Sequence, residues 1–313
     1  MTGMPEVSVV VPTHDRRELL ALTVCTILWQ SDVDLEGVVD DDGSPDPTIA
    51  ATVVRQFGDP RVRIVRQEPS GGVSAARNRG IAESRGSWLA FCDDDDLWAP
   101  DKLARQVSAA KDGGCHWVYT GAVRVDARQQ IIGGTPPPSP DQLLAYLPYW
   151  NPMPGGCSGV VAAASALADV GGFDGRYRHF ADWELWNRLS TAGAPAVVSE
   201  PLVAYRIHPG NKTLDVAGMR EDLALMEQSY GRTPDWGAIH HYLAWVYLRS
   251  ARRAPALRHF AQAALHGSLL PVARSLAAVA RRRLPFRLPG AAPHDDGSTA
   301  WRQSANEWLD RVG

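Results

Sequence analysis

Short apolar runs alternate with helical patterns along the N-terminal part of the chain. The run at residues 7–11 is short and rich in valine, as is typical of a central parallel strand covered on both faces. Strands are predicted at residues 7–11, 38–39, 62–65 and 88–92. Apolar positions at helical spacing predict helices at residues 18–30, 48–56, 74–84 and 101–110. This alternation predicts βαβ units and an α/β fold with a mostly parallel sheet.

The remaining chain carries shorter elements and then helices. Alternation at residues 117–132 predicts a pair of strands, and the proline-rich stretch 133–140 predicts a surface loop. Further strands are predicted at 159–163 and 197–205, and helices at 165–170, 182–192, 219–230, 239–252, 256–266 and 272–283. We therefore expect an α/β domain at residues 1–215, a helical Arg-rich region at 216–290 and a tail at 291–313.

Composition indicates a folded protein of a reducing compartment. The hydrophobic content is 45%, and no run approaches the roughly 20 apolar residues that span a bilayer. The N-terminus lacks the features of a secretory signal, so a cytoplasmic location is expected. The cysteines show no close pairing and are expected to be buried thiols: Cys25, Cys92, Cys115 and Cys157.

Charge is distributed unevenly. Residues 236–294 contain no Asp or Glu but carry nine arginines: Arg249, Arg252, Arg253, Arg258, Arg274, Arg281, Arg282, Arg283 and Arg287. This asymmetry indicates contact with an anionic surface, such as the inner face of a membrane, to which the protein would bind peripherally. A homodimer interface, or a solvated bundle docked on the first domain, are the alternatives. No nucleic-acid partner is expected.

Two acidic clusters follow predicted strands. Asp41 and Asp42 end one strand, and four successive aspartates, Asp93 to Asp96, follow another. Ligands in open α/β sheets bind beyond the carboxyl ends of the strands, and carboxylates with diphosphate oxygens commonly hold Mg²⁺ or Mn²⁺. A glycine turn at residues 71–72 then opens a helix bearing Arg77, which suits an anion. The alternatives are ordinary turns and a helix N-cap.

These motifs together resemble a known family. In order they read VSVVVPTHDR, VVDDDGSPD, GGVSAARNRGI, WLAFCDDDDLWAPDKL and GGFDGRYRHFADWELWNRL. The set resembles the family 2 glycosyltransferases with the GT-A fold, over roughly residues 5 to 212. The resemblance implies a metal-dependent, inverting transfer of a sugar from a nucleotide-diphosphate sugar to an acceptor hydroxyl, with Mn²⁺ or Mg²⁺ as cofactor. It favours UDP, with GDP and dTDP as alternatives, and leaves the acceptor unknown.

The resemblance also implies site residues. The nucleotide pocket would be lined by Pro12, Thr13, His14, Asp42, Arg77 and Asp94. Asp42 would recognise the base and Asp94 the ribose. The metal ligands would be Asp93, Asp95 and His208, although His208 could instead contact phosphate. The chain departs from the family at His14-Asp15, where Tyr-Asn is more frequent, and at Ala181, where the family often has Glu.

The catalytic base implied by the resemblance is Asp182. Asp182 shares one helical face with Leu185, Trp186 and Leu189, so packing of the apolar three would aim the carboxylate. Asp182 would take the proton of the acceptor hydroxyl as that oxygen attacks the anomeric carbon. A helix cap is the alternative role. The neighbouring Trp183, Glu184 and Trp186 are expected to contact the sugar, although a tryptophan at a helix start is more often core.

Two other functions remain open from the sequence. A nucleotidyltransferase also uses aspartates and a metal on an α/β sheet, but the distant segment ADWELW favours an acceptor site. A silent protein that only binds sugar nucleotides or acts as a scaffold is the other alternative, because Ala181 and His14-Asp15 depart from the family.

Overall fold

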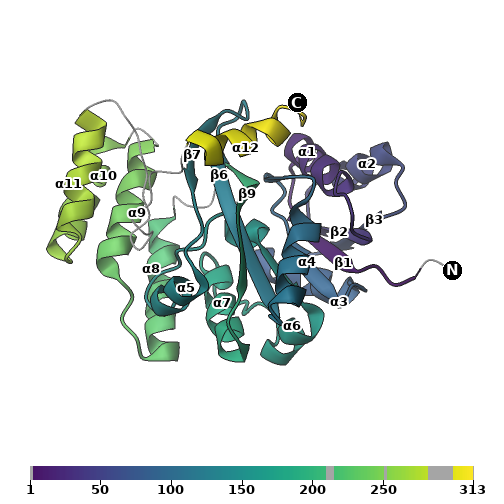
Figure 1. The fold of residues 1–313 in the computed structure, drawn as a ribbon, viewed down its shortest axis with the longest axis horizontal. Coiled ribbons are helices and arrows are strands. Elements are labelled where there is room, and N and C mark those ends of the chain that lie inside the picture. Colours follow the sequence, from purple (N-terminus) through teal and green to yellow (C-terminus); the bar gives the residue numbers. More distant parts are fainter. Residues whose placement is uncertain (1–2, 209–214, 250–251, 281–298, 313) are drawn as a thin grey trace.

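The computed structural model describes residues 3–208, 215–249, 252–280 and 299–312, and its centre is a nine-stranded sheet (Figure 1). The strand order is β3-β2-β1-β4-β8-β6-β9-β5, and β7 pairs with β6. The strands are β1 (Val7–Thr13), β2 (Leu35–Asp42), β3 (Val62–Gln67), β4 (Trp88–Phe91), β5 (Leu97–Trp98), β6 (Trp117–Val125), β7 (Ile131–Thr135), β8 (Val160–Ala163) and β9 (Ala196–Arg206). The predicted α/β fold is confirmed.

The parallel half of the sheet positions the acidic clusters. β1 pairs in parallel with β2 and with β4, and β2 pairs in parallel with β3. Their carboxyl ends therefore meet at one edge, where Thr13 lies opposite Asp41 and where the aspartates after β4 begin. The helices of this half are α1 (Arg17–Leu28), α2 (Thr48–Phe57) and α3 (Val73–Glu83). Gly80 lets α3 approach β1, because a Cβ there would overlap the Val10 side chain.

The second half of the sheet is mixed and holds the start of α7. β8 runs antiparallel to β4 and β6, whereas β9 runs parallel to β6. Its helices are α4 (Lys102–Asp112), α5 (Pro140–Tyr146), α6 (Ala164–Val170) and α7 (Ala181–Ala192). Leu185, Trp186 and Leu189 of α7 are fully buried in the main core. This packing fixes the helix whose first turn carries Asp182.

The helices after residue 215 do not form one separate unit. They are α8 (Val216–Tyr230), α9 (Trp236–Arg249), α10 (Arg253–Leu265), α11 (Leu269–Ala280) and α12 (Thr299–Leu309). Residues of α8, α9 and α12, such as Leu223, Ile239 and Trp308, belong to the main core. α10 and α11 pack through a smaller cluster that includes Trp245 and Phe260. Figure 1 shows α10 and α11 at the end of the molecule far from α2 and β3.

Several sequence expectations were wrong. The expected loop at residues 133–140 contains the end of β7 and the start of α5, and the short strand β5 was missed. β7 tolerates Gly134 because the ring of Trp301 in α12 fills the space that a side chain would need. Cys92 and Cys157 are buried as expected, but Cys25 is exposed and Cys115 partly exposed. The predicted helix end at 281–283 lies outside the described residues. Within the described ranges, every helix is too short or too polar to cross a bilayer.

Candidate active site

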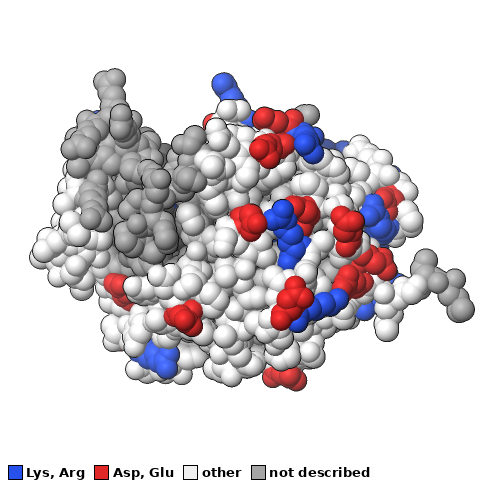
Figure 2. Space-filling model, in the orientation of Figure 1, with Lys and Arg blue, Asp and Glu red and all other residues white. Residues whose placement is uncertain are grey.

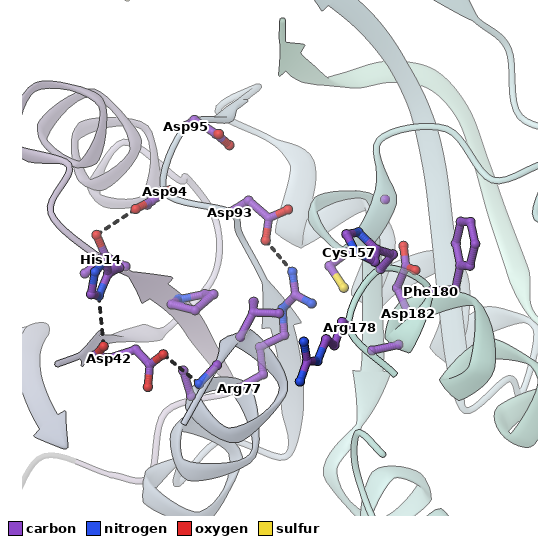
Figure 3. Close-up of a pocket in the computed structure, with 18 of the residues that line it drawn as sticks. His14, Asp42, Arg77, Asp93, Asp94, Asp95, Cys157, Arg178, Phe180 and Asp182 are labelled. Atoms are coloured by element: carbon purple, nitrogen blue, oxygen red, sulfur yellow. Dashed lines mark hydrogen bonds and ion pairs between the residues drawn. The ribbon is translucent and has the colours of Figure 1, made fainter. Parts of the chain in front are cut away.

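A cavity of about 450 Å³ lies at the carboxyl ends of β1, β2 and β4. It brings together nine of the predicted residues: Pro12, Thr13, His14, Asp42, Arg77, Asp93, Asp94, Asp95 and Asp182. Figure 3 shows His14 and Asp42 on one side of this cavity and Asp182 on the other. The strand-tip acids and the helix-borne Asp182 therefore share one site, although they are far apart in the sequence.

Asp42 lies on the side of the cavity opposite Asp182 and accepts several hydrogen bonds there. Its carboxylate accepts hydrogen bonds from the hydroxyl of Ser70 at 2.7 Å and from the backbone N–H groups of Gly71 and Gly72, both at 2.9 Å. Burial opposes ionisation, but these hydrogen bonds hold the pKa of Asp42 below its ordinary value. The ring Nδ1 of His14 lies 2.9 Å from the carbonyl oxygen of Asp42. The glycine turn before α3 is thus tied to β2 by an ionised carboxylate.

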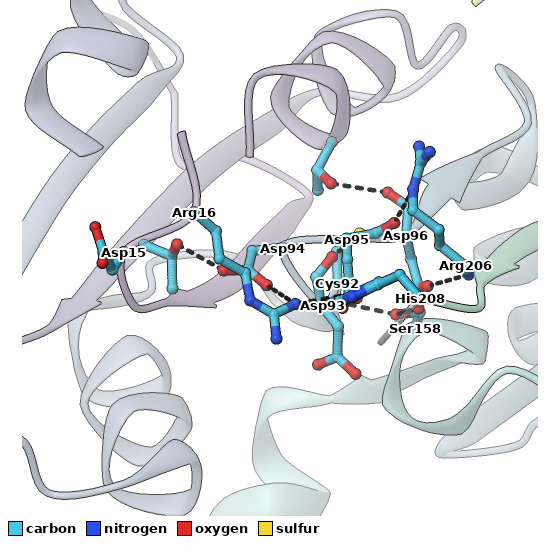
Figure 4. A network of polar contacts seen from close by, with 12 residues as sticks. Asp15, Arg16, Cys92, Asp93, Asp94, Asp95, Asp96, Ser158, Arg206 and His208 are labelled. Atoms are coloured by element: carbon cyan, nitrogen blue, oxygen red, sulfur yellow. Dashed lines mark hydrogen bonds and ion pairs between the residues drawn. The ribbon is translucent and has the colours of Figure 1, made fainter. Parts of the chain in front are cut away.

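Asp94 connects the first strand to the acidic run. The Thr13 hydroxyl donates to Asp94 at 2.7 Å, and Arg16 Nη1 lies 3.4 Å from the other oxygen of Asp94 (Figure 4). Burial, followed by the charge of Asp95, raises the pKa of Asp94 to about 7, although the Thr13 hydrogen bond opposes the shift. A raised pKa is expected where a carboxyl is buried and like charges are crowded around it.

Asp95 and His208 form a pair suited to a divalent ion. His208 Nε2 lies 2.9 Å from Asp95 Oδ2, close to the separation of roughly 3 Å between neighbouring ligands of an octahedral ion with bonds of about 2.1 Å. Arg16 Nη1 contacts both atoms, at 2.5 Å from Asp95 Oδ2 and 3.3 Å from His208 Nε2. A cationic group therefore already lies against both donor atoms. Their chemistry fits Mn²⁺ or Mg²⁺.

The third predicted metal ligand lies apart from this pair. Asp93 instead forms an ion pair with Arg77, at 2.5 Å. Within the described parts of the chain, no three His, Cys, Asp or Glu side chains are arranged to hold a metal. A divalent ion at Asp95 and His208 would therefore need further ligands, and diphosphate oxygens commonly supply them to Mg²⁺.

Buried hydrogen bonds fix the acidic loop, and sequence reasoning missed the residues that make them. Asp96 is fully buried and accepts from the Ser158 hydroxyl at 2.6 Å and from the backbone N–H of Arg206 at 3.1 Å. The Arg206 side chain donates to the Asp95 carbonyl at 3.0 Å (Figure 4). Arg16 was missed too, because its partners lie almost eighty residues away.

Asp182 lies at the end of the cavity opposite the Asp42 side. It is the second residue of α7 rather than the N-cap, which is Phe180. Its Oδ1 accepts from the backbone N–H of Trp183 at 2.7 Å. Burial raises the pKa of Asp182, and the charge of Arg77 opposes that shift. A carboxylate with a raised pKa at a cavity wall has the properties of a general base.

Trp183, Glu184 and Trp186, which were expected to contact the sugar, are buried in the core. Trp183 is 1% exposed and donates its indole N–H to the Leu147 carbonyl at 2.6 Å. Trp186 is fully buried and stacks on Trp117, with ring centroids 6.2 Å apart. Glu184 is buried and forms an ion pair with Arg188. None of the three lines the cavity, because the helix that presents Asp182 turns the next positions into the core.

The cavity wall beyond Asp182 comes from the segment before α7, which lies in the last of the quoted motifs, and from two C-terminal helices that sequence reasoning did not connect with the site. Arg178, His179 and Phe180 precede α7, while Met219 and Tyr242 come from α8 and α9. Cys157 and Tyr205 also line the cavity. The C-terminal helices therefore shape the site as well as covering the core, and no local motif could have indicated this.

Comparison with known proteins identifies the family. The model of glycosyl transferase family 2 matches residues 8–171, more than half of the chain. The chain belongs to glycosyltransferase family 2. The matched region of the glycosyltransferase contains β1, β2, α3 and the acidic run after β4, and it ends before Asp182. The resemblance inferred from the motifs is thereby confirmed.

Individual relatives support the same assignment. The chain is 34% identical over 119 residues to TuaG of Bacillus subtilis, covering 37% of this chain and 46% of that protein. It is 27% identical over 180 residues to the Escherichia coli UDP-Glc:alpha-D-GlcNAc-diphosphoundecaprenol beta-1,3-glucosyltransferase WfgD, covering 58% of this chain and 68% of that protein. The chain thus spans less than half the length of TuaG.

A solved structure shares the fold over nearly the whole chain. The mannosyltransferase PcManGT of Pyrobaculum calidifontis, in complex with GDP-Man and Mn²⁺, superimposes with a TM-score of 0.56 at 19% identity. The match covers 99% of this chain and 86% of that chain. The similarity extends beyond the family match and includes the region of the C-terminal helices.

Proposed function

We propose that this glycosyltransferase moves a sugar from a nucleotide-diphosphate donor to an acceptor hydroxyl, with inversion at the anomeric carbon. The observation that carries the proposal is the shared cavity, in which the acids of the strand tips face Asp182. A bound diphosphate near the Asp95 and His208 pair would leave the sugar between the acids and Asp182. Neither a nucleotidyltransferase nor a silent binding protein needs a base at that place.

The donor is proposed to lie with its nucleotide against β1, β2 and α3. Pro12, Thr13 and His14 would line the nucleotide, with Asp42 at the base and Asp94 at the ribose. UDP is favoured, and the name of WfgD includes a UDP-sugar donor. GDP is the main alternative, because PcManGT was solved with GDP-Man.

The cofactor is proposed to be Mn²⁺ or Mg²⁺ held by Asp95, His208 and the donor diphosphate. When bound, such an ion stabilises the negative charge that develops on the leaving diphosphate. Arg16 contacts the same two side chains, so it has to share or yield its position when an ion binds. Arg77, held by Asp93, places a further positive charge at the cavity wall.

The chemical step is assigned to Asp182. The acceptor hydroxyl would lie on the Asp182 side of the sugar and lose its proton to the carboxylate as its oxygen bonds to the anomeric carbon. The bond from that carbon to the diphosphate oxygen breaks at the same time, so one displacement inverts the configuration. Asp182 must be ionised for this step; burial raises its pKa, and the charge of Arg77 opposes that shift.

A donor screen tests the proposed function. UDP-, GDP- and dTDP-sugars would be incubated with the full chain and Mn²⁺, and release of the nucleoside diphosphate would be measured. We expect release from one nucleotide class, and we expect chelation of Mn²⁺ to abolish it. Absence of both turnover and nucleotide binding across the panel would remove the proposal.

We also propose that α10 and α11 contact an anionic membrane surface. α10 buries Ala256, Phe260 and Ala263, but its opposite side exposes Leu257 at 60% and Leu265 at 79%. α11 likewise exposes three large side chains: Leu269, Leu270 and Leu276.

Charge favours a membrane as the occupant of this surface. Residues 236–294 contain no acid, and exposed arginines lie near Leu257 in the sequence: Arg252, Arg253 and Arg258. Elsewhere, the face seen in Figure 2 carries interspersed acidic and basic side chains. Exposed leucines beside cations are the combination that binds anionic lipid headgroups.

Vesicle sedimentation tests this surface. We expect the chain to sediment with phosphatidylglycerol vesicles, less so in high salt, and to lose about 10-fold in binding when Leu257, Leu265, Leu269 and Leu270 become Ser. Ile132→Ser is the control, because Ile132 is an exposed apolar residue of β7. Equal binding by both variants would contradict the proposal, and conversion of a dimer to a monomer by the leucine changes would point to a homodimer interface instead.

A further inference from the structure

We infer that the acceptor substrate carries an anionic group, a phosphate or a carboxylate, that Arg178 binds next to the reacting hydroxyl. The claim that the bound anion belongs to the acceptor rests on the proposed function. The binding site itself rests on the charge balance of the cavity and on the way the segment 178–180 is held.

Arg178 differs from the other arginines of the cavity in its partners. Arg16 interacts with Asp94 and Asp95, and Arg77 interacts with Asp93. The Arg178 side chain also lines the cavity, yet it forms no hydrogen bond or ion pair with any part of the chain that the structure describes. Arg178 is exposed, so it is a solvent-facing positive charge on the cavity lining that the described protein groups do not balance.

The backbone around Arg178 is held firmly by one buried carboxylate. Asp222 of α8 is 3% exposed and accepts three backbone N–H groups in succession, those of Arg178 at 3.0 Å, His179 at 2.7 Å and Phe180 at 2.9 Å. Buried ionised groups are retained where such hydrogen bonds satisfy them. The side chain of Arg178 is thus carried by a fixed backbone, which reduces the entropy lost when it binds a ligand.

The position of Arg178 assigns it to the acceptor rather than to the nucleotide. Figure 3 shows Arg178 near Asp182, Cys157 and Phe180 and across the cavity from His14 and Asp42. In the proposed function, the donor diphosphate is matched by Arg77 and by the divalent ion that Asp95 and His208 would hold. An anion at Arg178 is therefore a second one, on the side from which the acceptor hydroxyl approaches Asp182.

The chemistry of this region suits an acceptor with an anion and an apolar part. The guanidinium of arginine binds phosphate or carboxylate through two parallel hydrogen bonds. Phe180, Met219 and Tyr242 line the same cavity and offer apolar contact to the rest of the molecule. A sugar joined to a lipid through a diphosphate, a sugar phosphate and a uronic acid all present such an oxyanion.

A small oxyanion tests the site without knowledge of the acceptor. Phenyl phosphate would be titrated by calorimetry into the full chain saturated with UDP and Mg²⁺. We expect binding to the wild type and a loss of about 10-fold or more in Arg178→Ala, because a hydrogen bond to a charged group is removed. Arg178→Lys should retain part of the affinity, since the charge remains.

The matched control is Arg176→Ala. Arg176 lies two residues earlier, pairs with Asp174 and does not line the cavity, so phenyl phosphate should bind this variant as it binds the wild type. Equal affinity of Arg178→Ala and wild type, or no binding to the wild type, would overturn the inference. A parallel loss of UDP affinity in Arg178→Ala would also overturn it, because Arg178 would then serve the donor.

Acceptor kinetics distinguish the sources of the anion. Four acceptors would be compared: a sugar linked to a short prenyl chain by a diphosphate, a sugar 1-phosphate, a uronic acid glycoside and a neutral methyl glycoside. We expect an anionic acceptor to be preferred, with KM rising about 10-fold or more in Arg178→Ala and kcat changing much less. Preference for the neutral glycoside would contradict the inference. If no donor is used at all, the proposed function fails, while a phenyl phosphate titration of the chain without nucleotide still decides the role of Arg178.

Discussion

Replacement of Asp182 by Asn is expected to lower the rate of sugar transfer by about 10²- to 10⁴-fold, the contribution typical of a general base. Asparagine has nearly the same shape and can still accept the hydrogen bond from the Trp183 N–H, so α7 should begin as before. The affinity for the nucleotide should change little, because Asp182 lies across the cavity from Asp42. Transfer would be measured as release of the nucleoside diphosphate in the presence of acceptor.

The pH profile gives the same experiment a second readout. A protonated carboxyl cannot accept the proton of the acceptor, so kcat/KM should fall as the pH falls through the pKa of Asp182. Burial raises that pKa, which moves the acid limb above the ordinary range of an aspartate. Asp169→Asn, an exposed aspartate of α6 outside the cavity, is the matched control and should behave as the wild type. Unchanged turnover in Asp182→Asn would show that another group is the base.

Replacement of Asp95 by Asn is expected to lower transfer by about 10²-fold or more, the loss typical of removing a group that stabilises charge in the transition state. The predicted cause is weaker binding of Mn²⁺ together with the donor diphosphate. Asparagine keeps the size of the side chain, and the Asp95 carbonyl can still accept from Arg206. High Mn²⁺ should restore part of the activity, which loss of folding would not allow.

His208→Gln should show the same dependence on Mn²⁺, because His208 Nε2 lies next to Asp95 Oδ2. The matched control is His116→Gln, since His116 is exposed and does not line the cavity. Metal-independent activity in the wild type, equal to that with Mn²⁺, would contradict the account of this pair. In that case Arg16, which contacts both side chains, would be the group that supplies the positive charge.

The parallel half of the fold could be predicted because its signals are local. Short apolar runs placed β1, β2 and β4, and the rule that parallel strands end at one edge placed the acids after β2 and β4 together. The order of several motifs then indicated the family. The shape of the acceptor side could not be predicted, because Met219, Tyr242 and the anchor Asp222 lie on helices that no motif connects to the cavity.

Nearness in the sequence was a poor guide to the surroundings of the aromatic residues beside Asp182. Trp183 and Trp186 lie near the base in sequence, which made sugar contacts plausible, but in the first turns of α7 those positions face the core. Which side of a helix faces a cavity depends on the neighbouring elements. Here Trp186 stacks on Trp117 of β6, and Trp183 donates to the carbonyl of Leu147. Similarly, Arg16 was missed because its partners come from the acidic run and from His208.

The central claim is that this cavity is one nucleotide-sugar site with separate groups for metal binding and for catalysis. Measuring nucleotide binding apart from sugar transfer tests it most directly. Calorimetric titration of UDP and of GDP into wild type, Asp182→Asn and Asp95→Asn, each with and without Mn²⁺, measures it. We predict that Mn²⁺ tightens nucleotide binding equally in the wild type and in the inactive Asp182→Asn protein, and that it does so far less in Asp95→Asn. Nucleotide binding that ignores both Mn²⁺ and the Asp95 substitution would contradict the assignment of one nucleotide-sugar site to this cavity.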